Sequence, residues 1–241
     1  MDLVHLGYSG LSFTVAGDRV CVDPPEPGAG TTVLTWTETE RVAGTREGLR
    51  RGRGKPGEIA ADPAVLAWLG VDGVAVRADP VALGAWSIRA LPYRPIPYAT
   101  PVEALRKARC TLRAPRFAFG RVALALRRPR CPPLAIELTH GRLRVALLGQ
   151  ALHRFTTHEE RARLVAWCRG AEVVVAGTDY DDEAATGGLL GAFGARVYVV
   201  ADLTGAIRRR IGLPTRPIGT VLTTAPPGTR LLEVGETLRV D

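Results

Sequence analysis

The first part of the chain alternates apolar and polar residues with the period of β-strands. Residues 2–6, 11–15 and 19–22 carry β-branched or apolar side chains at alternate positions, and Gly10 and Gly17-Asp18 separate these segments. Alternation of this kind predicts strands with one buried face. The glycine-containing turns between them favour antiparallel neighbours. The chain is therefore expected to open with a β-meander.

Proline and glycine mark the limits of the next elements. Pro24 ends the meander, because proline has no amide hydrogen for a ladder, and Thr32 to Trp36 is the next apolar segment. A short helix is predicted between Asp62 and Gly70, with an aspartate N-cap, proline at the first helical position and glycine past the end. The three prolines of Leu91 to Tyr98 favour a loop over a helix or an inner strand.

The second half mixes strands with helices. A capping box, either Thr156 with Glu159 or Thr157 with Glu160, predicts a helix that runs through Trp167 and ends at Gly170. The other predicted elements are strands at 134–138 and 143–148 joined by a Thr139–Gly141 turn, a buried strand at 172–176, a helix at 182–193, a buried strand at 197–201, and closing strands at 230–233 and 237–240. This order is typical of an α/β fold.

Composition excludes several classes of protein. The chain has 241 residues, of which 46% are hydrophobic and 23% charged, so it is neither a disordered tail nor a collagen-like repeat. Its 4 cysteines are scattered without a C-x-x-C pair, which favours free thiols in a reducing compartment. No apolar run approaches the roughly 18 residues of a membrane span. We therefore expect a cytoplasmic protein without a membrane partner.

Positive charge is concentrated in one stretch. The net charge is +8, and no acidic residue interrupts Leu105 to Ile136. Within this range nine basic residues occur: Arg106, Lys107, Arg109, Arg113, Arg116, Arg121, Arg127, Arg128 and Arg130. The segment Phe117–Leu126 is typical of a strand or hairpin, so the arginines either protect a solvated sheet edge or bind a polyanion. The arginine excess over lysine is also compatible with coding bias alone.

Several motifs, in order, resemble those of the metallo-β-lactamase superfamily. The segments 4–10, 19–24 and 32–44 resemble the opening of L-ascorbate-6-phosphate lactonase and related small hydrolases, which runs L-G-H-S, I-D-P and L-T-H-x-H-x-D-H-x-G. Weaker matches follow at 145–150, 182–202 and 227–236. The resemblance implies a four-layer αββα sandwich. It also implies one domain, 1–241, with two ββα halves of roughly 1–110 and 111–241.

The same resemblance implies a dinuclear zinc or manganese site, but the matched positions carry other residues. They are Trp36, Glu38, Glu40, Arg41, Gln150 and Asp202, while Tyr8 replaces the L-G-H-S histidine and the third histidine has no counterpart among Tyr93 to Tyr98. Indole offers no lone pair, a guanidinium repels a dication, and a glutamine amide is not a bridging anion. We therefore expect the dinuclear site to be lost and no metal cofactor to be bound.

Glu38, Glu40 and Asp202 leave three possibilities for the former site. Arg41 could form a structural ion pair with a neighbouring carboxylate. The carboxylates could instead hold Mg²⁺ or Ca²⁺, which prefer oxygen ligands. A metal-free acid and base pair is the third possibility.

The histidines are expected to lie at the surface or in turns rather than to bind metal. They are His5, His140, His153 and His158, of which His153 borders the strand end at Gly149-Gln150. The acidic run 179–183 is expected to cap a helix, because acids favour the positive N-terminal end.

Three functional hypotheses follow. The first is a pseudoenzyme that binds or scaffolds, with an anionic small molecule or a protein as partner. The second is a hydrolase of a small anionic or ester-like substrate that uses Glu38, Glu40 and Asp202. The third, nucleic-acid binding through 106–130, is less favoured because only Phe117 and Phe119 could stack on bases.

Overall fold

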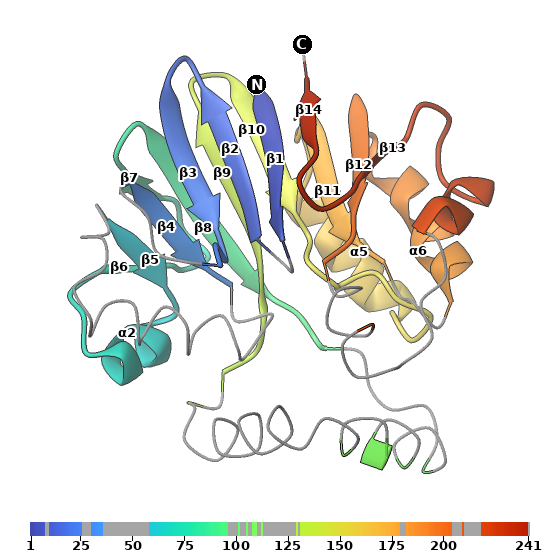
Figure 1. The fold of residues 1–241 in the computed structure, drawn as a ribbon, viewed down its shortest axis with the longest axis horizontal. Helices are drawn as coiled ribbons and strands as arrows, with labels where there is room; N and C mark the ends of the chain where they lie inside the picture. Colours follow the sequence, from blue (N-terminus) through green and yellow to red (C-terminus); the bar gives the residue numbers. More distant parts are fainter. Residues whose placement is uncertain are drawn as a thin grey trace.

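Two mixed β-sheets form the centre of the molecule (Figure 1). The computed structural model describes residues 1–7, 10–25, 30–35, 58–95, 131–178, 182–203 and 218–240, and the single positions 101, 105, 108, 109, 112, 129 and 209. Within these residues each sheet has seven strands.

The first sheet is built mainly from the start of the chain. Its strands, in the order β14-β1-β2-β3-β4-β5-β6, are β14 (Thr237–Arg239), β1 (Asp2–Gly7), β2 (Gly10–Val15), β3 (Asp18–Val22), β4 (Thr31–Leu34), β5 (Ile59–Ala61) and β6 (Val74–Ala75). The antiparallel meander β1-β2-β3 confirms the prediction, and β3 to β6 then pair in parallel.

The second sheet contains the hairpins and crossovers that follow. Its strands, in the order β13-β12-β11-β10-β9-β8-β7, are β13 (Arg230–Leu232), β12 (Val197–Ala201), β11 (Val173–Gly177), β10 (Leu143–Leu147), β9 (Leu134–His140), β8 (Trp86–Pro92) and β7 (Val81–Leu83). Strands β10 to β13 are parallel, as strands joined through helices are.

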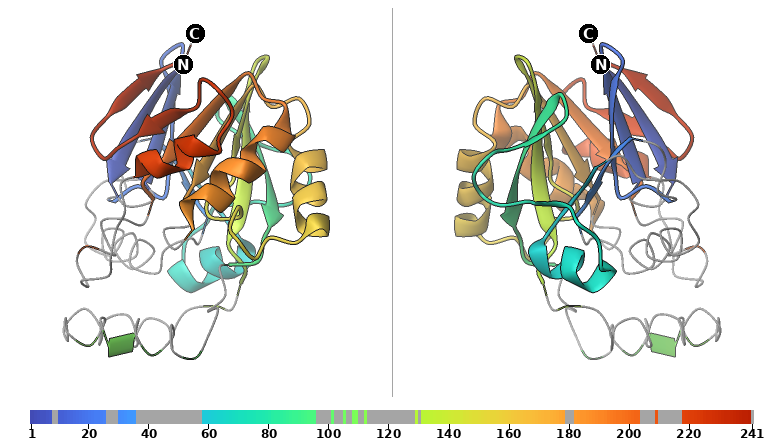
Figure 2. Two further views of the ribbon diagram at one scale, coloured as in Figure 1. Left: turned by 90° about the vertical axis from the view of Figure 1, so that its right-hand side faces the viewer. Right: turned by 90° about the vertical axis from the view of Figure 1, so that its left-hand side faces the viewer.

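Helices lie against the outer face of each sheet, while the inner faces pack on one another. The inner core joins Phe13 and Val33 of the first sheet to Ile88 and Val175 of the second. Outside the first sheet lies α2 (Pro63–Leu69), and outside the second lie α5 (His158–Trp167) and α6 (Glu183–Leu190), which a 3₁₀ turn, η1 (Gly191–Phe193), continues (Figure 2). The predicted αββα sandwich is confirmed.

Local signals located the helix ends well. Asp62 accepts a hydrogen bond from the Ala64 amide at the start of α2, and Gly70 ends that helix with φ of 69°. At α5, Thr157 and Glu160 form the capping box, which decides between the two predicted pairs. Asp182 caps α6, as expected for the acidic run, although residues 179–181 lie outside the described part.

The expectation of a loop from Leu91 onward was partly wrong. Leu91 and Pro92 belong to β8 and pair with Ala135 and Leu134 of β9. Pro92 is tolerated because the pairing of β7 with β8 reaches only Ile88, so β9 alone adjoins this end of the strand. Residues 96–98 of the predicted loop lie outside the described residues.

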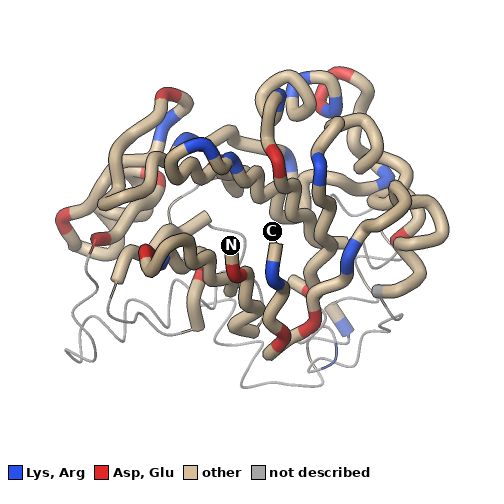
Figure 3. The backbone as a smooth tube through the Cα atoms, turned by 90° about the horizontal axis from the view of Figure 1, so that it is seen from above, with Lys and Arg blue, Asp and Glu red and all other residues tan. Residues whose placement is uncertain are grey.

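Charged residues of both signs are interspersed along the described backbone (Figure 3). The predicted strand or hairpin at Phe117–Leu126 lies outside the described residues, as does most of the basic stretch 106–130. Among the described residues, no helix has the length and apolar character needed to cross a membrane.

Candidate functional site

The carboxyl ends of many strands meet at one edge of the sandwich. Strands β1, β3 and β4 of the first sheet and β8, β10, β11 and β12 of the second end at the lower edge in Figure 1, opposite the two termini. In open parallel sheets, ligands bind beyond the carboxyl ends of the strands. This edge is therefore the candidate functional site.

Two of the six positions matched to metal ligands lie in the described structure, and both lie at this edge. Gln150 follows β10 and Asp202 follows β12. The other four, Trp36, Glu38, Glu40 and Arg41, lie outside the described residues, together with Tyr8. The ion pair expected for Arg41 thus stays a prediction.

Asp202 is held from two sides. Its carboxylate oxygen Oδ2 accepts hydrogen bonds from Nη1 and Nη2 of Arg209, at 3.4 and 3.3 Å. Its main-chain oxygen lies 2.9 Å from Nε2 of His5 in the first sheet. The ion pair partner is one that sequence reasoning missed: Arg209 is the middle residue of Arg208-Arg209-Arg210, and nothing in that run indicates which carboxylate it meets.

His5 is buried, so the expectation of a surface or turn histidine was wrong for this residue. Its Nδ1 accepts a hydrogen bond of 3.1 Å from the Gly7 amide, so in the neutral ring Nε2 carries the hydrogen and donates to Asp202. The reason for the burial is tertiary. β1 is an inner strand, and its end lies against the second sheet.

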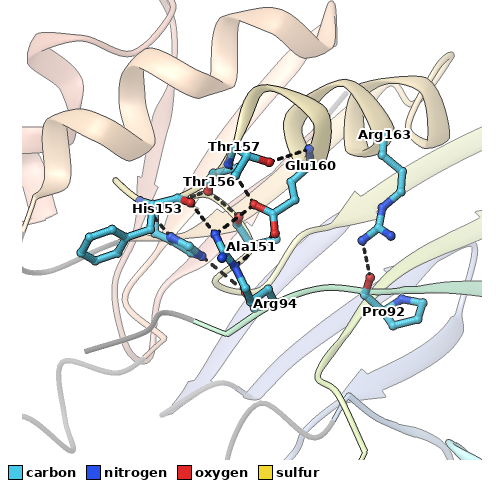
Figure 4. A network of polar contacts seen from close by, with 9 residues as sticks. Pro92, Arg94, Ala151, His153, Thr156, Thr157, Glu160 and Arg163 are labelled. Atoms are coloured by element: carbon cyan, nitrogen blue, oxygen red, sulfur yellow. Dashed lines mark hydrogen bonds and ion pairs between the residues drawn. The ribbon is translucent and has the colours of Figure 1, made fainter. Parts of the chain in front are cut away.

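His153 begins a turn, in line with the expectation, since its main-chain oxygen accepts from the Thr156 amide at 2.8 Å, but its side chain is buried rather than at the surface. Its Nδ1 accepts from the Phe155 amide at 3.2 Å, and Nε2 lies 3.3 Å from the main-chain oxygen of Arg94 (Figure 4). The Nδ1 contact therefore stays within the segment after β10, while the Nε2 contact joins the chain after β8 to the chain after β10. In the same way, the hydroxyl of Tyr93 accepts a hydrogen bond of 3.2 Å from the Gln150 amide.

Arg94 extends this network to the start of α5. Its guanidinium donates to the Phe155 main-chain oxygen at 2.6 Å and lies 3.1 Å from Glu160 Oε1 (Figure 4). The hydrogen bond from the Thr157 amide lowers the pKa of Glu160, and Arg94 adds to the effect, although partial burial opposes both. The carboxylate therefore both caps the helix and positions Arg94.

Asp23, the aspartate of the segment matched to I-D-P, is buried at the end of β3. It accepts hydrogen bonds from the amide of Thr35, at 2.9 Å, and from the Thr35 hydroxyl. Its φ of 43° is unusual for a residue with a side chain. Asp23 thus fixes the point where the chain leaves β4 for residues 36–41.

The described residues of this edge do not by themselves fit a dinuclear metal centre. No group of three His, Cys, Asp or Glu side chains gathers at ligand spacing within the described part of the chain. Gln150 carries no charge, Asp202 faces a guanidinium, and the rings of His5 and His153 are engaged at both nitrogens. Zinc requires three or four convergent donors.

Comparisons with known proteins show similarity at the level of structure. No family model matches the chain, and no curated protein does. A candidate metal-dependent hydrolase from Parabacteroides distasonis ATCC 8503 is 13% identical with a TM-score of 0.61, over 97% of this chain and 92% of that one. The metallo-β-lactamase fold protein YhfI from Bacillus subtilis is 10% identical with a TM-score of 0.56, over 98% of each chain.

A third solved structure agrees. Isothiocyanate hydrolase from Delia radicum gut bacteria is 14% identical with a TM-score of 0.57, over 100% of this chain and 99% of that one. At such low identity the similarity establishes the fold and not the activity. Together with the two seven-stranded sheets and their outer helices, it shows that this chain has the metallo-β-lactamase fold.

Proposed function

We propose that the protein is a metal-independent binding protein of the metallo-β-lactamase fold, which takes its ligand at the edge formed by Gln150 and Asp202. The observation that carries the proposal is the pairing of the Asp202 carboxylate with the Arg209 guanidinium. At this position the superfamily resemblance would place a metal ligand. A permanent positive charge within about 4 Å of that carboxylate opposes the binding of a dication there.

The chemistry of Gln150 supports the same conclusion. Its position corresponds to the bridging aspartate of a dinuclear centre, but an amide has lone pairs without charge. It can donate and accept hydrogen bonds, and it cannot neutralise two metal ions. A site built from an amide and an ion pair recognises a ligand by hydrogen bonds and supplies neither a metal-bound hydroxide nor an activated nucleophile.

Elemental analysis tests this proposal. The untagged protein would be produced with added zinc and manganese, purified without chelator and measured for metal content per chain. We expect well below one metal ion per ten chains. A content near one or two ions per chain that survives dialysis would overturn the proposal. The Arg209→Gln variant serves as the control, because metal binding by that variant alone would show that the guanidinium excludes the cation.

A hydrolase of a small anionic or ester-like substrate is the second candidate. It is motivated by the burial of the Asp202 carboxylate at this edge and by the hydrolase names of similar structures. A panel of lactones and nitrophenyl esters, tested with metal-depleted protein, separates the two functions. Turnover by the wild type that disappears in Asp202→Asn would support the hydrolase. No turnover of any substrate by the wild type would favour binding alone.

A further inference from the structure

Thr178 is the buried polar residue at this edge that the functions above do not use. It follows β11 and has an exposed fraction of 0%. Its hydroxyl oxygen has no hydrogen-bond partner in the described structure. Burying a hydroxyl without a partner lowers the stability of a folded protein, so such a group calls for an explanation.

Thr178 lies between the two site residues already described, Gln150 and Asp202. In the sheet Val145 pairs with Val173, and Val173 pairs with Val197. Gln150 follows β10, Thr178 follows β11 and Asp202 follows β12, so the three residues form a row at the ends of three adjacent parallel strands. The Gly177 amide donates to the Gly149 oxygen and the Ala151 amide to the Leu148 oxygen, so Gln150 lies in a turn that begins where the pairing of β10 with β11 ends.

The middle residue of the row is the most deeply buried. Gln150 is partly exposed, Asp202 is 7% exposed, and Thr178 is fully covered. Helix α6 begins at Glu183, shortly after Thr178, so the row lies between the strand ends and the start of a helix. Open α/β sheets bind their ligands beyond the carboxyl ends of their strands, where these residues lie.

The charges at the row argue against an anionic ligand. Asp202 and Glu183 are both buried acids, whereas Arg209 is the described cation on the Asp202 carboxylate. An anion that contacts Asp202 would be repelled by that carboxylate. A ligand that donates hydrogen bonds to a carboxylate and also accepts them from an amide or a guanidinium would be matched by the groups present.

We propose that this row binds a small neutral polyol, one hydroxyl of which forms a hydrogen bond with Oγ1 of Thr178. Adjacent hydroxyls of the ligand bond to the amide of Gln150 and to the pair Asp202–Arg209. The inference rests on the proposed metal-independent binding function and gives its ligand class. On this proposal the hydroxyl of Thr178 forms its hydrogen bond only with the ligand, and leaving it unpaired makes the free protein less stable.

Two matched threonine variants test the proposal. Thr186 is as buried as Thr178, but its hydroxyl donates to the Leu152 oxygen at 3.0 Å. Thr178→Val should leave the free protein as stable as the wild type or more stable. It should weaken polyol binding about fivefold or more, because one hydrogen bond to the ligand is lost. Thr186→Val should lower stability and leave polyol binding unchanged.

The probes would be myo-inositol and D-glucose, with gluconate and glucose 6-phosphate as anionic counterparts, measured by isothermal titration calorimetry and by thermal unfolding. Nonspecific stabilisation by polyols acts on all variants alike and is subtracted by comparison. Stronger binding of the anions, equal binding by Thr178→Val and the wild type, or no detectable binding would overturn the proposal. So would a less stable Thr178→Val, since it would mean that a buried water already satisfies the hydroxyl.

Metal content separates the two proposals. A metal-free protein that binds no polyol leaves metal-independent binding standing and removes only the ligand class. A protein that contains stoichiometric metal removes the proposed function, whatever the polyols do.

Discussion

Replacing Glu137 by glutamine is expected to lower the free energy of unfolding by about 3–5 kcal/mol. Glu137 lies in β9 beneath α5, and its side chain is only 5% exposed. Oε1 accepts from Nε of Arg89 at 2.9 Å, and Oε2 accepts from Nη2 of Arg89 at 2.9 Å and from Nη2 of Arg144 at 2.8 Å. One buried carboxylate therefore holds two guanidinium groups.

The size of the stability loss follows from the two guanidinium groups, which the glutamine amide would leave without a counter-charge. Both arginines are mostly covered, with side chains 25% and 32% exposed, so neither guanidinium can regain full hydration. Their remaining donors also hold the end of α5, since Arg89 bonds to the Trp167 oxygen at 2.7 Å and Arg144 to the Arg169 oxygen at 2.9 Å. Breaking a buried ion pair from one side leaves an uncompensated charge. For a chain of this size the melting temperature should fall by about 6–20 °C.

Urea unfolding followed by circular dichroism measures the effect. Arg144→Ala should cost less than Arg89→Ala, because Arg89 makes the two-oxygen contact and also lies 5.3 Å from the centre of the Trp167 ring. The matched control is Glu172→Gln, whose pair with Arg196 is 3.8 Å long with side chains 42% and 57% exposed. It should change stability by less than about 1 kcal/mol. A loss below about 1 kcal/mol in Glu137→Gln would refute the reasoning.

Three other features give predictions of their own. Burial raises the pKa of Cys168 from 9.0 to about 12, so the thiol should resist dithionitrobenzoate in the folded protein. Because the folded protein holds the thiol proton more tightly than the unfolded chain, the stability linked to the neutral thiol is complete below pH 9 and is lost as the pH rises toward 12. The urea midpoint should therefore fall more steeply above pH 9 in the wild type than in Cys168→Ala. Thr157→Ala removes the cap of α5 and should cost about 1 kcal/mol in urea unfolding. Gly187→Ala should lower the free energy of unfolding by more than about 2 kcal/mol in the same assay, because its Cβ would clash with Thr224 Oγ1 and the Val221 oxygen. Gly188→Ala, which has open space around the Cβ, is the control.

Elements specified by neighbouring residues could be predicted from the sequence. The caps at Asp62 and Thr157 depend on hydrogen bonds between residues two to three positions apart, so the local pattern contains the whole signal. Strand β7 was not predicted, because it has only three residues and its stability comes from pairing with β8. Pro92 was assigned to a loop because the sequence does not show where a neighbouring strand ends.

The same contrast between local sequence signals and long-range contacts applies to the candidate site. The resemblance pointed to Gln150 and Asp202, which follow the parallel strands β10 and β12, with β11 between them. The burial of His5 could not be predicted, because its partner Asp202 is 197 residues away in the chain. Arg209 was missed for a similar reason. A guanidinium in a basic run meets its carboxylate only once the fold brings β12 to the edge of the sandwich.

The hydrogen bond between His5 and Asp202 also bears on how the two sheets are held together at the site. In the dinuclear centre that the resemblance implies, ligands from the segment after β4 and from Asp202 and Gln150 would share metal ions, and the ions would join the first sheet to the second. In the described structure, direct hydrogen bonds make such links: His5 of β1 bonds to the Asp202 oxygen at 2.9 Å, and the Leu134 amide at the start of β9 bonds to the Thr35 oxygen after β4 at 2.9 Å. Each bond occupies polar main-chain groups that are costly to bury unpaired. Under the proposed function, hydrogen bonds of this kind would hold the edge together at Gln150 and Asp202 without a metal ion.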